Sequence, residues 1–166
     1  MYGELNNTDN KHFNEIWKIE DINTFIIEMD NWLGKKCNYG ESIEKLSACE
    51  KVFYLNQTLE REVNNGGLVQ FLNCGDYFCA AETENALREI GANYTASNYK
   101  KVLDAFACEL PKAQAEREEL LDHIIDDEKY NIIDEFNNEF WKYHDDLNKL
   151  NYQFVMRNKT QFGYTS

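Results

Sequence analysis

The chain has 166 residues and a formal net charge of −13, with 30 acidic against 17 basic side chains. This length suits one domain, and a hydrophobic content of 43% is enough to build a core, so the acidity does not indicate disorder. The charge disfavours direct binding to nucleic acid, and no apolar run reaches the roughly 18 residues that a membrane helix needs. The polar N-terminus lacks a signal pattern, and we expect a cytoplasmic protein.

Apolar residues recur at helical spacing along nearly the whole chain. This pattern predicts an all-α fold, a single compact domain of about six to seven helices. We expect an N-terminal segment at 1–20, the helical domain at 21–156 and a C-terminal tail at 157–166. The stretch 13–19 is ambiguous between a helical turn and a short extended piece.

The first clear helix has an apolar stripe over residues 22–33. A long second helix is predicted to begin after Ser42, a candidate N-cap, and to end near Val63. The segment 64–67 reads Asn-Asn-Gly-Gly and is expected to stop it, because asparagine and glycine accept the left-handed backbone of a helix C-terminus. A short helix is expected to follow at 68–73.

Two further helices are expected at about 80–90 and after Thr95. Pro111 is expected in the first turn of the next helix, where its missing N–H costs nothing. The inward arc of that helix comprises Leu120, Leu121, Ile124 and Ile125. One last helix is expected to continue from Ile132 to Phe154, with its apolar residues facing inward.

Acidic residues concentrate between Glu109 and Asp146, where thirteen of them face four basic residues, a net charge of −9. Helical spacing places these acids on the outward arcs of the last two helices. A row of carboxylates resembles a row of phosphates electrostatically, and it attracts proteins that bind nucleic acid. The predicted partner-binding residues are Glu116, Glu119, Asp122, Asp126, Asp127, Asp134, Glu135, Glu139, Asp145 and Asp146.

A motif in the middle of the chain joins the long helix to the short one through two adjacent glycines, so the backbone must turn sharply there. Gln70 is expected to hydrogen-bond carbonyl groups that the turn leaves unpaired. We interpret the motif as mainly structural, a helix–helix corner; the alternative is a pocket for a small ligand or peptide. Its residues are Glu62, Asn65, Gly66, Gly67, Gln70 and Phe71.

The motif reads E-x-x-N-G-G-x-x-Q-F, and it is followed by a turn at 75–76 and a helix that ends in Ile-Gly-Ala at 90–92. In this combination it resembles a bacterial family of domains of unknown function, whose best-known member is an acidic DNA-mimic protein that binds a transcriptional repressor. The resemblance extends over about 52–106. It implies a mainly helical fold, and it implies DNA mimicry by analogy.

We therefore expect a non-enzymatic acidic interaction protein that occupies the basic surface of a DNA-binding transcription factor or another cationic protein. No direct contact with nucleic acid or membrane is expected, and both a monomer and a homodimer fit. One alternative is a helical module that binds a small ligand or peptide at the Asn-Gly-Gly corner. Another is an immunity-type inhibitor of a basic toxin.

Enzyme signatures are weak in this sequence, and we expect no catalytic residue, metal or cofactor. Glu119 and His123 are four residues apart, a spacing that allows both to bind one metal ion from the same helix. A helical carboxylate site would normally have Glu-x-x-His pairs on two helices, and the sequence has none. The five cysteines form no C-x-x-C pair, which argues against a zinc site and a disulfide framework. Cys74 and Cys79 are close enough to pair, but we expect them to stay reduced. A metal enzyme is the last alternative.

Overall fold

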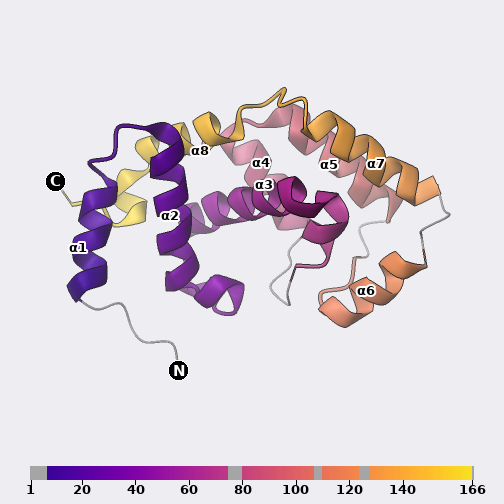
Figure 1. Ribbon diagram of the computed structural model, residues 1–166, viewed down its shortest axis with the longest axis horizontal. Coiled ribbons are helices and arrows are strands. Elements are labelled where there is room, and N and C mark those ends of the chain that lie inside the picture. The colour runs from indigo at the N-terminus through magenta and orange to yellow at the C-terminus, as the bar shows by residue number, and fades with distance from the viewer. Residues whose placement is uncertain (1–6, 75–79, 107–109, 124–127, 166) are drawn as a thin grey trace.

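Eight α-helices and three short 3-10 helices make up the described part of the chain in the computed structural model, which covers residues 7–74, 80–106, 110–123 and 128–165 (Figure 1). No strand occurs among these residues, so the all-α prediction is confirmed, with more helices than expected. The α-helices are α1 Asn7–Ile16, α2 Ile22–Lys36, α3 Ala48–Leu72, α4 Ala80–Ile90, α5 Asn93–Ala105, α6 Gln114–Asp122, α7 Glu128–Phe140 and α8 Leu147–Arg157. The 3-10 helices are η1 Asn38–Gly40, η2 Ile43–Lys45 and η3 Lys159–Phe162.

Helix α3 runs through the middle of the molecule, and every residue from Phe53 to Leu59 is buried. A helix that is buried all round must be covered on all sides, and α2, α4, α7 and α8 all pack against it. Helix α5 packs between α4 and α7, and α1 packs on α2, where the ring of Phe13 stacks 4.2 Å from that of Trp32. None of the described helices is both long and apolar enough to cross a membrane.

The N-terminus of α3 is capped by Ser47, not by the predicted Ser42. The Ser47 hydroxyl accepts a hydrogen bond from the Glu50 N–H at 3.2 Å, and the Glu50 carboxylate accepts one from the Ser47 N–H at 2.7 Å. This reciprocal pair satisfies two backbone donors that a helix start leaves free. Ser42 instead precedes η2, and its side chain makes no capping bond.

The predicted stop at the double glycine is a kink within α3. Gly66 has φ −158° and ψ 21°, and Gly67 has φ +76°, a backbone region that favours glycine. A Cβ on Gly66 would lie 2.0 Å from the Gln70 side-chain oxygen, and one on Gly67 would lie 3.0 Å from Asn137 Nδ2. Gly67 therefore needs glycine for its backbone conformation, whereas a side chain at Gly66 would displace the end of the Gln70 side chain. Asn65 is exposed on the turn before them.

Side chains from both sides of the kink hold it in place. Gln70 donates to the Glu62 carboxylate at 2.7 Å, so the prediction that it would bond free carbonyl groups is wrong. The Leu68 N–H donates to Asn137 Oδ1 of α7 at 2.7 Å, which supplies the acceptor that the broken helix lacks. Phe71 is buried in the core.

The predicted last helix is two helices, because the chain turns between Phe140 and Leu147, where Tyr143 has φ +50°. Most apolar residues of the predicted stripe are buried as expected, whereas Ile132 and Leu150 are only partly buried. Pro111 lies before α6, which begins at Gln114, and not in its first turn. Thr95 lies inside α5 and not before it.

Candidate functional site

Helix α6 is anchored to the core by Arg117, a buried residue with 0% exposure. Its guanidinium donates to the carbonyl oxygen of Leu72 at 2.6 Å and to that of Pro111 at 3.0 Å. It also donates to the carbonyl oxygens of Cys74 and Lys112. These bonds join the C-terminus of α3, where carbonyl groups lack helical partners, to the start of α6. Sequence reasoning counted Arg117 among the surface charges and missed this role.

The charged side chains that α6 exposes are all acidic, because Arg117 points inward. Glu116, Glu119 and Asp122 have no ion-pair partner among the described residues, and Glu118 accepts a hydrogen bond from Gln114 at 2.9 Å. Their negative charge therefore faces solvent, with no cation in contact with it in the described part of the chain. In Figure 1, α6 lies at one end of the molecule, beside the end of α3 and below α7.

Helix α7 adds Asp134 and Glu135, both exposed. Asp134 accepts a hydrogen bond from Asn138 at 3.3 Å. Glu135 lies 3.7 Å from the ammonium of Lys101, and both side chains of this pair are more than 60% exposed. Such a pair is weak and screened by salt, so Glu135 keeps most of its charge available to a partner.

Glu139 is engaged within the molecule. Its carboxylate accepts hydrogen bonds from Lys142 and from the Tyr94 hydroxyl, the latter at 2.5 Å. These bonds, that of Lys142 first, lower the pKa of Glu139 to about 2. The His144 ring lies beside Tyr94, with centroids 4.2 Å apart. This cluster joins the end of α7 to the start of α5.

Two more of the predicted partner-binding acids act as caps. Asp145 accepts hydrogen bonds from the N–H and the hydroxyl of Thr95, at 2.8 and 2.9 Å. Asp146 accepts from the Lys149 N–H at 3.0 Å and so caps α8. Asp126 and Asp127 lie outside the described residues. We use the name acidic face for a set of exposed carboxylates on two helices, Glu116, Glu118, Glu119 and Asp122 of α6 with Asp134 and Glu135 of α7.

A cleft of about 420 Å³ lies between the second part of α3, α6 and α7. Asp122 and Asp134 contribute to it from two different helices, so the α6 and α7 parts of the acidic face meet there. The alternative interpretation of the motif is a pocket around Gly66, Gly67 and Gln70. Gly66 lines the cleft, whereas the Gln70 side chain is hydrogen-bonded to Glu62. The lining residues are Gly66, Val69, Asn73, Leu121, Asp122, Tyr130, Ile133, Asp134 and Asn137.

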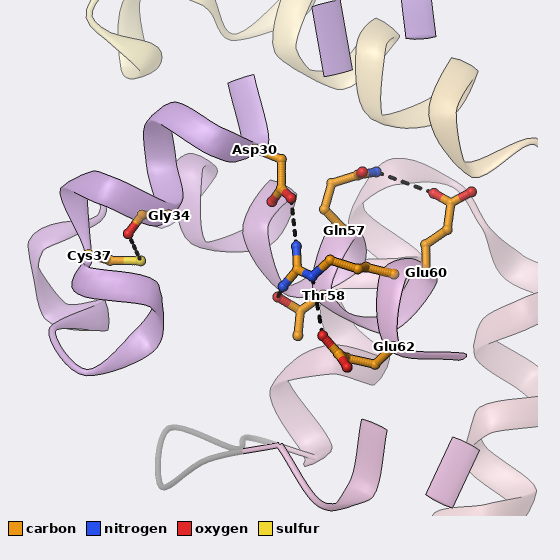
Figure 2. Close-up of polar contacts among 8 residues, drawn as sticks. Asp30, Gly34, Cys37, Gln57, Thr58, Glu60 and Glu62 are labelled. Atoms are coloured by element: carbon orange, nitrogen blue, oxygen red, sulfur yellow. Dashed lines mark hydrogen bonds and ion pairs between the residues drawn. The ribbon is translucent and has the colours of Figure 1, made fainter. Parts of the chain in front are cut away.

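A second group of carboxylates, with Asp30 and Glu62, contacts Arg61 on α3. Figure 2 shows the two labelled acids on either side of the side chain that joins them. The guanidinium donates to Asp30 at 2.6 Å, to Glu62 at 3.2 Å and to the Thr58 hydroxyl at 3.3 Å. Burial raises the pKa of Asp30, and Arg61 opposes that shift. Here each acid lies beside a cation or a hydrogen-bond donor, so these acids make their contacts within the fold.

Glu60 belongs to the same region, and Gln57 donates to it at 3.3 Å (Figure 2). Burial raises the pKa of Glu60 to about 7, and the negative charges of Asp146 and Asp30 add to the shift. Asp146, predicted to meet a partner, therefore interacts with the half-buried carboxyl group of Glu60 within the molecule. No sequence pattern distinguishes Glu60 from the exposed acids.

The histidines and cysteines are dispersed. His123 Nδ1 lies 2.6 Å from the Glu119 carbonyl oxygen, which is contact with the backbone and not with the carboxylate. His12 lies 3.1 Å from Glu28. Among the described residues, no group of three His, Cys, Asp or Glu side chains could hold a metal ion. Cys37 and Cys49 are free thiols, and Cys79 and Cys108 lie outside the described residues.

Comparison with known proteins gives one family. Residues 44–158, which include the double-glycine motif, the acidic face and the cleft, match the family described as DMP19-like protein. No curated protein and no solved structure matches the chain. The matched segment covers more than half of the 166 residues. The chain therefore belongs to the DMP19-like protein family.

Proposed function

We propose that this protein is a non-enzymatic interaction protein that places its acidic face against the basic surface of a DNA-binding protein or another cationic protein. One observation carries the proposal: α6 exposes four carboxylates while its arginine is buried against backbone carbonyl groups. Membership of the DMP19-like family is consistent with a role of the DNA-mimic type.

The mechanism that follows is electrostatic. Uncompensated carboxylates on adjacent helices create a negative potential that steers a cationic surface toward the acidic face. Once bound, the face occupies the surface that would otherwise contact phosphates, so the partner and nucleic acid exclude each other. Because exposed charges are screened by ions, association is fastest at low ionic strength.

The test begins with capture of partners from the native host and continues with each captured protein in purified form. Its dissociation constant for this protein, and its binding to duplex DNA in competition, are measured across a salt series. We expect affinity to fall steeply as salt rises and DNA to be displaced. Affinity that is indifferent to salt, or DNA binding that continues unchanged, would contradict the proposal.

A matched pair of triple variants separates the acidic face from net charge. The first carries Glu116→Gln, Glu118→Gln and Glu119→Gln; the control carries Glu20→Gln, Glu44→Gln and Glu89→Gln at exposed positions elsewhere. Both lose three negative charges. The first is expected to weaken binding at least tenfold and the control less than threefold, because only short-range charges are unscreened. Equal losses would show that net charge, not the face, attracts the partner.

A further inference from the structure

The cleft between α3, α6 and α7 has the chemistry of a site for one cationic side chain. Its volume of about 420 Å³ lies within the range of ligand pockets. Val69, Leu121 and Ile133 give it apolar walls, and the last two are buried. Asp122 and Asp134 are exposed and reach the cleft from facing helices. An aliphatic stem with a positive end fits this combination of apolar walls and two carboxylates.

The Tyr130 ring favours a guanidinium group over an ammonium group as the cation in this cleft. It lies one helical turn before Asp134 on α7, so the two side chains project from the same face of the helix. The ring is 45% exposed. A planar guanidinium stacks on such a ring while it donates to a neighbouring carboxylate; an ammonium group cannot do both equally well.

The lining of the cleft includes an amide whose oxygen is unpaired. Asn73 lines the cleft, and its Oδ1 is buried with no hydrogen-bond partner among the described residues. Asn137 differs, because its Oδ1 already accepts from the Leu68 N–H. A guanidinium has five N–H donors, enough for two carboxylates and an amide oxygen.

We propose that this cleft receives an arginine side chain of the basic partner, with Tyr130 as the stacking surface and Asp122 and Asp134 as acceptors. The inference rests on the proposed function, because it names the part of the partner that the acidic face recognises. Proteins that bind DNA contact phosphates largely through arginine and lysine, so such side chains are exposed on the surface to be covered. Bidentate arginine contacts add direction to an otherwise unspecific attraction.

The first experiment uses a small probe, N-acetyl-arginine-methylamide, and follows amide signals of the ¹⁵N-labelled protein by NMR. The side-chain amides of Asn73 and Asn137 are expected to shift on titration. The lysine analogue should bind at least threefold more weakly, and the uncharged citrulline analogue should cause no shift. Equal shifts with citrulline, or shifts spread over the whole acidic surface, would overturn the proposal.

Variants test the site itself. Val69→Phe fills the cleft without a change in charge and should abolish the shifts, whereas Asp134→Asn should weaken probe binding about fivefold. Glu116→Gln, on α6 outside the cleft, should change probe binding less than twofold. If Val69→Phe fails to fold, as judged by the dispersion of its NMR signals, Tyr130→Ala at an exposed position takes its place. Unchanged probe binding in these cleft variants would overturn the proposal.

A second measurement separates this inference from the proposed function. A captured partner that binds Val69→Phe as tightly as the native protein, but loses affinity for the α6 triple variant, would overturn the cleft and retain the acidic face. Conversely, arginine binding in the cleft without any salt-dependent basic partner would remove the proposed function, and the cleft would remain as a small-ligand site.

Discussion

Two groups of carboxylates in this molecule have the same chemistry and opposite surroundings. Around α2 and α3, Asp30 lies 2.6 Å from Arg61, and Glu50 lies 2.6 Å from Lys36 and is 1% exposed. On α6, the carboxylates face solvent, and Arg117 turns away from them into the core. The two regions differ in what their cations contact. Around α2 and α3 the cations contact the acids, whereas on α6 the guanidinium of Arg117 contacts backbone carbonyl groups.

This contrast separates stability from binding. Buried acids change the free energy of unfolding when they are altered, since a buried charge or its partner is left without compensation. Exposed acids without partners contribute little to folding and remain available to another molecule. The predictions below test this division from the largest expected effect to the smallest.

Replacement of Arg117 by methionine should have the largest effect. The carbonyl groups of Leu72 and Pro111 would lose their donor in a buried place, and we expect a loss of about 3 kcal/mol or more in the free energy of unfolding. Helix α6 should also open locally, which hydrogen exchange of its amides would reveal. Arg117→Lys is the control, with an intermediate loss. Full protection of α6 in the methionine variant would show that Arg117 is not its anchor.

Glu60→Gln should stabilise the protein, with an effect that depends on pH. Below the ordinary pKa of 4.5, the carboxyl is protonated in both states and contributes nothing. Between 4.5 and about 7, the unfolded chain releases a proton that the folded protein retains, so stability falls as pH rises. At pH 8 the glutamine variant should therefore be more stable by up to about 3 kcal/mol.

Urea denaturation at pH 4 and pH 8 would measure this effect of Glu60. The exposed Glu44 serves as the comparison, because Glu44→Gln should change stability equally little at both values. A gain for the Glu60 variant that is the same at pH 4 and pH 8 would contradict burial as its cause.

Ser47→Ala should cost about 1 kcal/mol, because it removes the cap of α3 and the bond from the Glu50 N–H. The matched control is Ser42→Ala, which should change stability by less than about 0.5 kcal/mol because Ser42 makes no capping bond. Thermal unfolding of the two variants would measure the difference. Equal losses would mean that the helix start depends on both serines.

The smallest effect on stability is expected for Glu116→Gln and Glu119→Gln combined. These acids lie three residues apart on α6, and like charges at that spacing repel by a few tenths of a kcal/mol. The variant should match the native protein to within about 0.5 kcal/mol in urea, with a slight gain at low salt. A large loss would place these two residues among the structural acids, beside Asp145.

Helices α2 to α6 and the corner at the double glycine could be predicted because apolar periodicity and glycine conformation are local properties of the sequence, whereas α1 was not predicted. Ser47 is followed three residues later by Glu50, the local signature of a capping box, whereas Ser42 is followed by Lys45, so the sequence already favours Ser47 as the cap. The turn after Phe140 does not interrupt the apolar stripe, so periodicity alone predicts one continuous helix there. Arg117 and Asp145 find partners on distant segments, and Glu139 finds one in Tyr94, so a count of charges along one helix cannot reveal these contacts. The ion pair of Glu139 with Lys142, three residues away, is local.

The tether of α6 has a consequence for how this fold can vary between related chains. Arg117 and Leu121 fix the inner side of the helix, so its outer positions can exchange residues without disturbing what lies beneath. In a scaffold of this kind, the residues that determine the fold are different from the residues that determine which partner is bound. Related proteins can keep the same fold and present different patterns of surface charge to different binding partners.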